Sequence, residues 1–326
     1  MRNRKLFMKR IIGCCAAAAM MAMLTGCTDT AKENQLAYKT VGINARDAGD
    51  YTGAADAFSR ALEQSIGIIG ADEIDLCYYK ADALYRAGDT EGAMNVYNAL
   101  LAYDDSLSEA HYLRGNLYLD QGNATDAIAD YHEAVRLDDR DLELYIAICE
   151  NLTNTGHAEE GQEFLTQATA LEGDAASDHA LRGRAYTLLG NYLEADKELQ
   201  EAVSAGDTDA LLYRGQLLMK NGDSDGAKVL YESYLEKKGE NAEAYNALGC
   251  MEMQCGDYAD ALNYFEQALA NAEQTGVNPQ EILRNRILAY EYNGQFAQAK
   301  IAMEEYAATY TLDADMQKEY TFLQTR

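Results

Sequence analysis

Histidine and cysteine are the side chains here that most often perform catalysis or bind metals, so their spacing is considered first. The four histidines are scattered, and none has a second metal ligand at helical spacing: His111, His132, His157 and His179. The sequence also contains no glycine-rich phosphate loop, no nucleophile elbow and no HExxH motif. We therefore expect no catalytic residues, no metal and no cofactor. We interpret His111 and His179 as packing residues.

One segment is similar to a calcium-binding loop. The run Asn221-Gly-Asp-Ser-Asp-Gly226, with Glu232 further on, approximates the twelve-residue loop that binds calcium through oxygen ligands. Asn221 stands where that loop has its first Asp, and Lys228 stands where an apolar residue belongs. We therefore interpret the run as an ordinary turn.

Composition narrows the class of protein. The 326 residues include 27 Lys and Arg against 54 Asp and Glu, a formal charge of −27. Such a polyanion is not expected to bind nucleic acid, because association with phosphate needs a basic face. A hydrophobic fraction of 48% and 24 Tyr argue against disorder. One Pro and no Trp, together with many Ala and Leu residues, favour an all-helical fold.

The N-terminus has the organisation of an export signal. Five basic residues within positions 1–10 precede an uncharged, mostly apolar run from Ile11 to Leu24, which is too short to span a bilayer. The run ends in Leu24-Thr-Gly-Cys27, which resembles the lipoprotein box of bacteria. The resemblance implies cleavage of residues 1–26 and diacylation of Cys27. An ordinary secretory signal that happens to contain a cysteine is the alternative.

These features predict where the mature chain resides. Two acyl chains hold a protein stably on a bilayer, so we expect a lipid-anchored protein on the extracytoplasmic face, periplasmic or extracellular. Without residues 1–26 its charge is −32. Residues 27–34 are expected to form a short tether that keeps the folded part near the membrane. We expect the four cysteines after Cys27 to be buried thiols: Cys77, Cys149, Cys250 and Cys255.

A repeat of about 34 residues fills the rest of the chain. A glycine followed by a polar residue recurs at intervals of 32 to 39, a small residue follows it by five, and a large apolar residue follows it by nine. A small residue usually precedes the glycine by seven. This pattern predicts pairs of short antiparallel helices joined at the glycine, which must stack to bury their apolar faces. The glycines are Gly49, Gly88, Gly122, Gly156, Gly190, Gly222, Gly256 and Gly294.

The pattern resembles the tetratricopeptide repeat, most clearly from Tyr245 to Leu269. The resemblance implies an all-α solenoid, a right-handed superhelix of about eight helix-turn-helix units. We place the units at 35–68, 74–107, 108–141, 142–175, 176–207, 208–241, 242–275 and 280–313, followed by a capping helix at 314–326. The family's proline near the repeat end is missing, and Gly161 and Ile287 depart from the small-residue pattern.

The resemblance also implies a concave surface, lined by the second, fifth, ninth and twelfth residues of each first helix. The second position is acidic in six of eight units, which both the helix dipole and a functional role explain. The other three positions are nearly neutral and rich in aromatic and aliphatic residues. They predict a ligand groove centred on the second and third units, although packing between units explains them too: Tyr78, Tyr85, Tyr112, Asn116, Leu119, Ile146, Arg184, Leu212 and Met219.

The same surface lacks the family's carboxylate clamp, since Ile43 and Asp82 stand where that clamp needs Asn. Three arginines at one scaffold position are interpreted as lying along their helix pairs: Arg114, Arg182 and Arg214. Together these features predict a non-catalytic scaffold that binds a protein or peptide. The alternatives are an assembly or pilot lipoprotein for a pilus, secretin or outer-membrane machine, and a lipoprotein that captures a solute or glycan.

Overall fold

A computed structural model describes residues 27–65 and 69–326, and the expected signal peptide (1–26) lies outside them. The described residues form 17 helices and no strand, which confirms the all-α repeat fold. The chain divides into two compact units, Met1–Phe164 and Leu165–Arg326.

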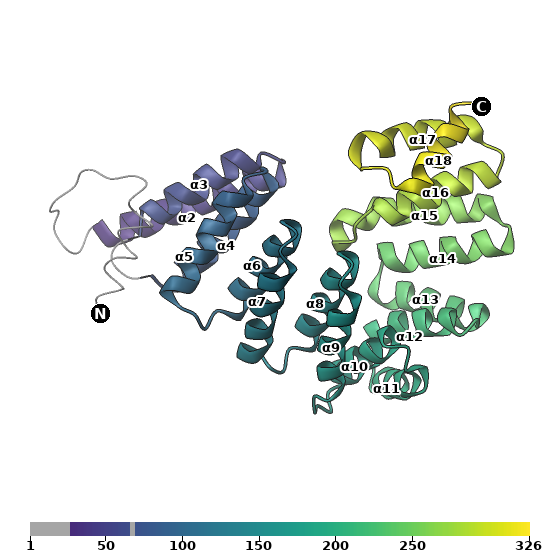
Figure 1. The fold of residues 1–326 in the computed structure, drawn as a ribbon, viewed down its shortest axis with the longest axis horizontal. Coiled ribbons are helices and arrows are strands. Elements are labelled where there is room, and N and C mark those ends of the chain that lie inside the picture. The colour runs from purple at the N-terminus through teal and green to yellow at the C-terminus, as the bar shows by residue number, and fades with distance from the viewer. Residues whose placement is uncertain (1–26, 66–68) are drawn as a thin grey trace. The chain divides into compact units, whose positions relative to one another are not determined.

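Unit 1 consists of helices that stack side by side as antiparallel pairs (Figure 1). Each first helix packs on its second, and each second helix packs on the next pair. The helices are α2 (Cys27–Asp47), α3 (Tyr51–Glu63), α4 (Ala71–Arg86), α5 (Thr90–Tyr103), α6 (Ser108–Asp120), α7 (Ala124–Leu137) and α8 (Leu142–Asn154); α9 (Ala158–Thr169) contains the boundary with unit 2.

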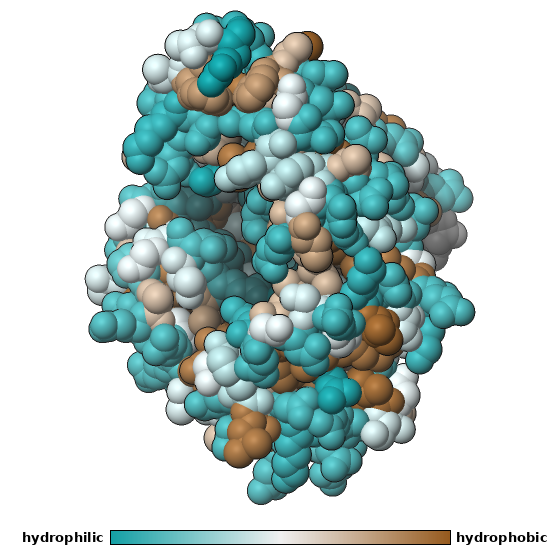
Figure 2. All heavy atoms as spheres, turned by 90° about the vertical axis from the view of Figure 1, so that its right-hand side faces the viewer, coloured by the Kyte–Doolittle hydropathy of each residue, from teal (hydrophilic) through white to brown (hydrophobic). Residues whose placement is uncertain are grey.

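Unit 2 repeats the arrangement and ends in a single helix (Figure 1). Its helices are α10 (Ala176–Leu188), α11 (Tyr192–Ser204), α12 (Asp209–Lys220), α13 (Ser224–Lys238), α14 (Ala242–Cys255), α15 (Tyr258–Thr275), α16 (Gln280–Tyr292), α17 (Phe296–Thr309) and α18 (Ala314–Leu323). Most of the face shown in Figure 2 is hydrophilic, with hydrophobic side chains gathered in separate patches.

The turn glycines behave as their spacing predicts. All eight have φ between +74° and +87°, the left-handed conformation that ends a helix and that glycine adopts without a steric penalty. The residue after the glycine then often caps the next helix. Asp89, for example, accepts a hydrogen bond from the backbone N of Gly92 at 2.8 Å.

The calcium-like run is one of these turns. Asp223 caps α13 by accepting from the backbone N of Gly226 at 3.0 Å, and Asp225 and Glu232 lie within that helix. Two other expectations differ from the structure. Residues 27–34 are helical and belong to α2, so they do not form an extended tether. Cys255 is exposed at the end of α14, where the helix faces solvent.

Close approach within each helix pair depends on the small residue before the turn. In the third pair, a Cβ atom added at Gly115 would lie 2.7 Å from a ring carbon of Tyr131, which is fully buried. Gly249 and Phe265 make the same contact in the seventh pair, at 2.5 Å. The aromatic ring therefore occupies the space that the missing side chain leaves.

Helix α18 closes the C-terminal end of unit 2. Met316 and Leu323 are buried against Ile287, Met303 and Tyr306 of the last pair. Asp313 caps α18 by accepting from two backbone N atoms, at 3.0 and 2.9 Å. The helix thus covers the apolar face that the last unit of a solenoid would otherwise expose.

A pair of carboxyl groups makes this cap sensitive to pH. Burial first, and then the charge and hydrogen bonding of Glu319 on α18, raise the pKa of Glu291 on α16 to about 7. The folded state therefore binds a proton at Glu291 more tightly than the unfolded chain does. The stability that this protonated group contributes is lost as pH rises from about 4.5 to 7.

We expect Glu291→Gln to abolish this loss. At pH 8 the variant should exceed the wild type in free energy of unfolding by about 1 kcal/mol, a value kept small because water screens a half-exposed pair. At pH 4.5 the two should be equal. Thermal denaturation at both pH values measures the difference, with exposed Glu304→Gln on α17 as the control. An equal advantage at both pH values would contradict this assignment.

Candidate ligand-binding groove

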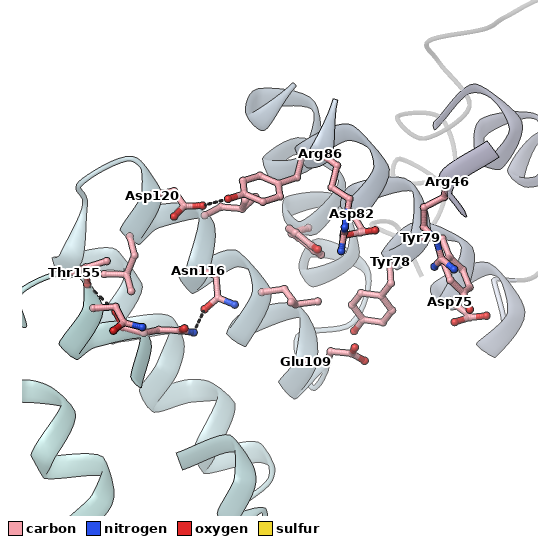
Figure 3. A pocket seen from close by; sticks show the side chains of 17 residues that line it. Arg46, Asp75, Tyr78, Tyr79, Asp82, Arg86, Glu109, Asn116, Asp120 and Thr155 are labelled. Carbon is pink, nitrogen blue, oxygen red and sulfur yellow. Dashed lines mark hydrogen bonds and ion pairs between the residues drawn. The ribbon is translucent and has the colours of Figure 1, made fainter. Parts of the chain in front are cut away.

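A hollow of unit 1 lies between α4 and α6 and extends to the end of α8 (Figure 3). Its volume is about 780 Å³. It is lined by four tyrosines, several leucines, three asparagines, four carboxylates and two arginines: Arg46, Asp75, Tyr78, Tyr79, Asp82, Tyr85, Arg86, Tyr97, Glu109, Leu113, Asn116, Leu117, Leu119, Asp120, Asn151, Asn154 and Thr155.

The tyrosines give the hollow large and well-ordered apolar walls. Tyr78 is half-buried, and its ring centroid lies 6.4 Å from that of the buried Tyr97. Tyr79 stacks on Phe58 at 5.3 Å. Tyr85 is 43% exposed and donates a hydrogen bond to Asp120 at 2.6 Å, which raises the pKa of Tyr85 to about 12. Amphipathic rings fixed in this way offer contact area at little cost in conformational entropy.

An amide cluster forms the wall opposite α4. Asn116 Oδ1 accepts from Tyr131 OH at 2.7 Å and from Asn151 Nδ2 at 3.0 Å. Asn151 Nδ2 also donates to Tyr112 OH at 3.1 Å. These bonds fix the Asn116 amide, whose NH₂ group points away from Asn151 (Figure 3). The cluster therefore presents an oriented donor to a ligand.

A second hollow adjoins the first. It has a volume of about 830 Å³ and shares Asp75, Tyr78 and Glu109 with the first hollow. It adds Tyr112 and Leu144, so it continues from α4 across α6 to α8. The two hollows form one elongated depression, which we call the unit 1 groove.

The structure divides the sequence-predicted groove residues into three sets. Five of them line the unit 1 groove: Tyr78, Tyr85, Tyr112, Asn116 and Leu119. Ile146 and Leu212 are only 2% and 4% exposed and belong to the core. Both stand at the fifth position of a repeat, where a short aliphatic side chain ends between the packed helices. Arg184 and Met219 pack within unit 2, where the guanidinium of Arg184 lies 5.1 Å from the ring centroid of Tyr213.

Comparison with known proteins identifies the repeat. The tetratricopeptide repeat family model matches residues 78–141 and 212–275. Each match spans two helix pairs, and the first contains Tyr78 and Tyr112 of the groove. These two segments are tetratricopeptide repeats.

The fold is also similar to that of solved tetratricopeptide repeat proteins. It is similar to a tetratricopeptide repeat protein from Parabacteroides merdae ATCC 43184, with 16% identity, a TM-score of 0.54, and coverage of 79% of this chain and 99% of that one. This likeness concerns the fold. PilW, a widely conserved type IV pilus biogenesis factor, gives 18% identity, a TM-score of 0.47 and coverage of 65% and 97%. No curated protein matches the chain.

The helix pairs contain an ionic network that the sequence pattern had not led us to expect. The guanidinium of Arg114 forms two bonds of 2.7 Å to the buried Asp130, and His111 Nδ1 lies 3.0 Å from the same carboxylate. Arg182, His179 and Glu198 repeat this arrangement in unit 2. These arginines and histidines are therefore paired across their helix pair.

A signal for the network was present in the sequence. The acidic residue follows the turn glycine by eight in both networks, and the arginine precedes that glycine by eight. Arg214 lacks an acid at that place, where Leu230 stands, and pairs with Asp196 at 3.1 Å.

Within residues 27–65 and 69–326, no three His, Cys, Asp or Glu side chains converge as metal ligands would. No helix described there is long and apolar enough to cross a bilayer.

Proposed function

We propose that this chain is a non-catalytic scaffold, anchored by lipid on the extracytoplasmic face, that binds a protein partner through the unit 1 groove. The observation that carries the proposal is the elongated, tyrosine-walled groove across α4, α6 and α8. Tetratricopeptide repeats suggest an interaction scaffold, and tyrosine is favoured where protein interfaces bury contact area. Two adjoining hollows suit an extended ligand better than a single small solute.

The partner-binding part is tested by crosslinking from intact cells. We expect the wild-type chain to capture one discrete protein, and the Tyr78→Ala/Tyr112→Ala variant to lose at least about 90% of it, because two ring contacts are removed. The matched control is Tyr192→Ala with Tyr292→Ala, two exposed tyrosines of unit 2. Capture of the same protein by the groove variant would place the binding site elsewhere. Absence of any protein partner would favour solute or glycan capture.

The anchoring part rests on Cys27, the first residue of α2. Because α2 begins at this residue and belongs to unit 1, an acyl group there would be attached directly to the first helix of unit 1. Lipid at Cys27 would therefore hold the groove close to the membrane.

We expect Cys27→Ser to abolish metabolic labelling with palmitate and to release the chain from the membrane fraction, since the proposed acylation site is removed. The control is Cys255→Ser, because Cys255 is the exposed thiol among the four described cysteines after Cys27. Labelling and membrane association should persist in that variant. Labelling that survives Cys27→Ser would disprove the anchor.

A further inference from the structure

The charges of the unit 1 groove do not balance. Arg86 pairs with Asp82 at 2.8 Å, and Arg46 pairs with Asp47, which lies outside the groove, at 2.9 Å. Asp75 pairs with Lys39. Of the four carboxylates that line the first hollow, Glu109 and Asp120 remain, and no basic side chain of the described residues forms an ion pair with either one. The groove therefore retains negative charge that the chain itself does not neutralise.

Glu109 lies where a cation would be held from several sides. Glu109 is exposed to solvent on the groove side of α6, and partial burial, followed by the charge of Asp75, raises its pKa. The hydroxyl of Tyr78 points toward Glu109 (Figure 3), and the Tyr78 ring in turn lies against the ring of Tyr97. A carboxylate next to aromatic rings suits an ammonium or guanidinium group through ion pairing and cation–π contact.

Asp120 forms a second negative position at the other end of α6. It accepts only the neutral hydroxyl of Tyr85. Glu109 and Asp120 are eleven positions apart along α6, which corresponds to a rise of roughly 16 Å. An extended peptide covers this distance with about five residues. Leu113, Leu117 and the Asn116 amide line the interval and would meet apolar side chains and a backbone carbonyl.

We propose that the unit 1 groove selects a basic peptide segment, with one Lys or Arg side chain at Glu109 and a second, about five residues away, at Asp120. The inference rests on the proposed scaffold function and names the chemistry of its partner. It excludes acidic peptide tails, which these carboxylates repel. Charge complementarity is the reason for this choice of occupant.

The test is selection of binding peptides by the full chain, held in detergent micelles, from a phage library of random twelve-residue peptides. We expect the selected peptides to be enriched in Lys or Arg at two positions about five residues apart. The strongest binder is then synthesised, and its affinity is measured by fluorescence anisotropy at two salt concentrations. Affinity should fall by about tenfold or more in Glu109→Gln/Asp120→Asn, because two charge contacts are lost.

A matched variant separates this site from the overall negative charge. Glu63→Gln/Glu163→Gln removes the same charge from exposed positions on α3 and α9 of unit 1, and should change affinity by less than about twofold. Equal weakening in both double variants would overturn the proposal. Circular dichroism checks that the variants are folded.

The remaining outcomes distinguish the two proposals. Selected peptides without basic enrichment, whose binding requires Tyr78 and Tyr112 and does not require Glu109 or Asp120, would overturn the basic-peptide inference and leave the scaffold function standing. Selection of no peptide, together with a shift of the melting temperature by an oligosaccharide such as cellohexaose, would overturn both.

Discussion

Replacing Asp130 with alanine will lower the free energy of unfolding by about 3–5 kcal/mol, the usual cost of removing one partner from a buried ion pair. Asp130 is 6% exposed and accepts two bonds of 2.7 Å from Arg114. His111 contacts the same carboxylate. Without it, the largely buried guanidinium of Arg114 and the buried ring of His111 would lose the carboxylate that they share.

Glu133 on the same helix provides the matched control. It pairs with Arg136 one turn away, and Arg136 is fully open to solvent. Because exposed pairs of this kind contribute little, Glu133→Ala should leave stability nearly unchanged. Urea denaturation followed by circular dichroism compares the two variants. Similar losses from Asp130→Ala and Glu133→Ala would show that burial of the network contributes nothing.

The network also shows what a repeat pattern leaves out. The glycine spacing predicts the turns, and all eight glycines take the expected backbone conformation. The offsets from each glycine predict which residues face the partner helix. The offsets do not say which polar side chains meet across that interface, because a contact depends on the lengths of the two side chains involved. His111 and Arg114 were therefore interpreted one at a time, although their partner occurs at a fixed offset.

The groove was predictable in position and less so in chemistry. Tyr78, Tyr112 and Asn116 line it as the repeat register indicates. Ile146 occupies the equivalent of the Tyr78 and Tyr112 position and is buried, since only the longer side chain reaches past the neighbouring helix. The sequence also favoured a nearly neutral surface. In the structure Glu109, a first-turn residue, lines the groove as well, so its carboxylate can complement the helix dipole and still face a ligand.

The last helix pair differs from the third and seventh pairs in both the small residue and the large residue beside it. Gly249 faces Phe265, and Gly115 faces Tyr131. In the last pair Ile287 takes the place of the glycine, and the opposite residue is the flexible Met303. A larger residue on the first helix is thus accompanied by a narrower side chain on the second, which preserves the packed volume.

Gly249→Ile should therefore destabilise unit 2 by about 3 kcal/mol. The Cβ atom of the new isoleucine would lie 2.5 Å from a ring carbon of Phe265. Phe265 is fully buried, so its ring cannot move aside without disturbing the close-packed core. Adding Phe265→Met should recover more than half of the loss, because the pair then matches Ile287 and Met303. Urea denaturation of the two single variants and the double variant gives the coupling free energy.

Gln254→Ile places the same side chain at an exposed position of α14 and controls for helix propensity, so it should change stability little. The sum of the losses in free energy of unfolding in the two single variants gives the loss expected without coupling. If the Gly249→Ile/Phe265→Met variant lost more than this sum, the two positions would not be compensating for each other's volume. If it recovers as expected, helix spacing within a tetratricopeptide pair is set by the summed size of two residues.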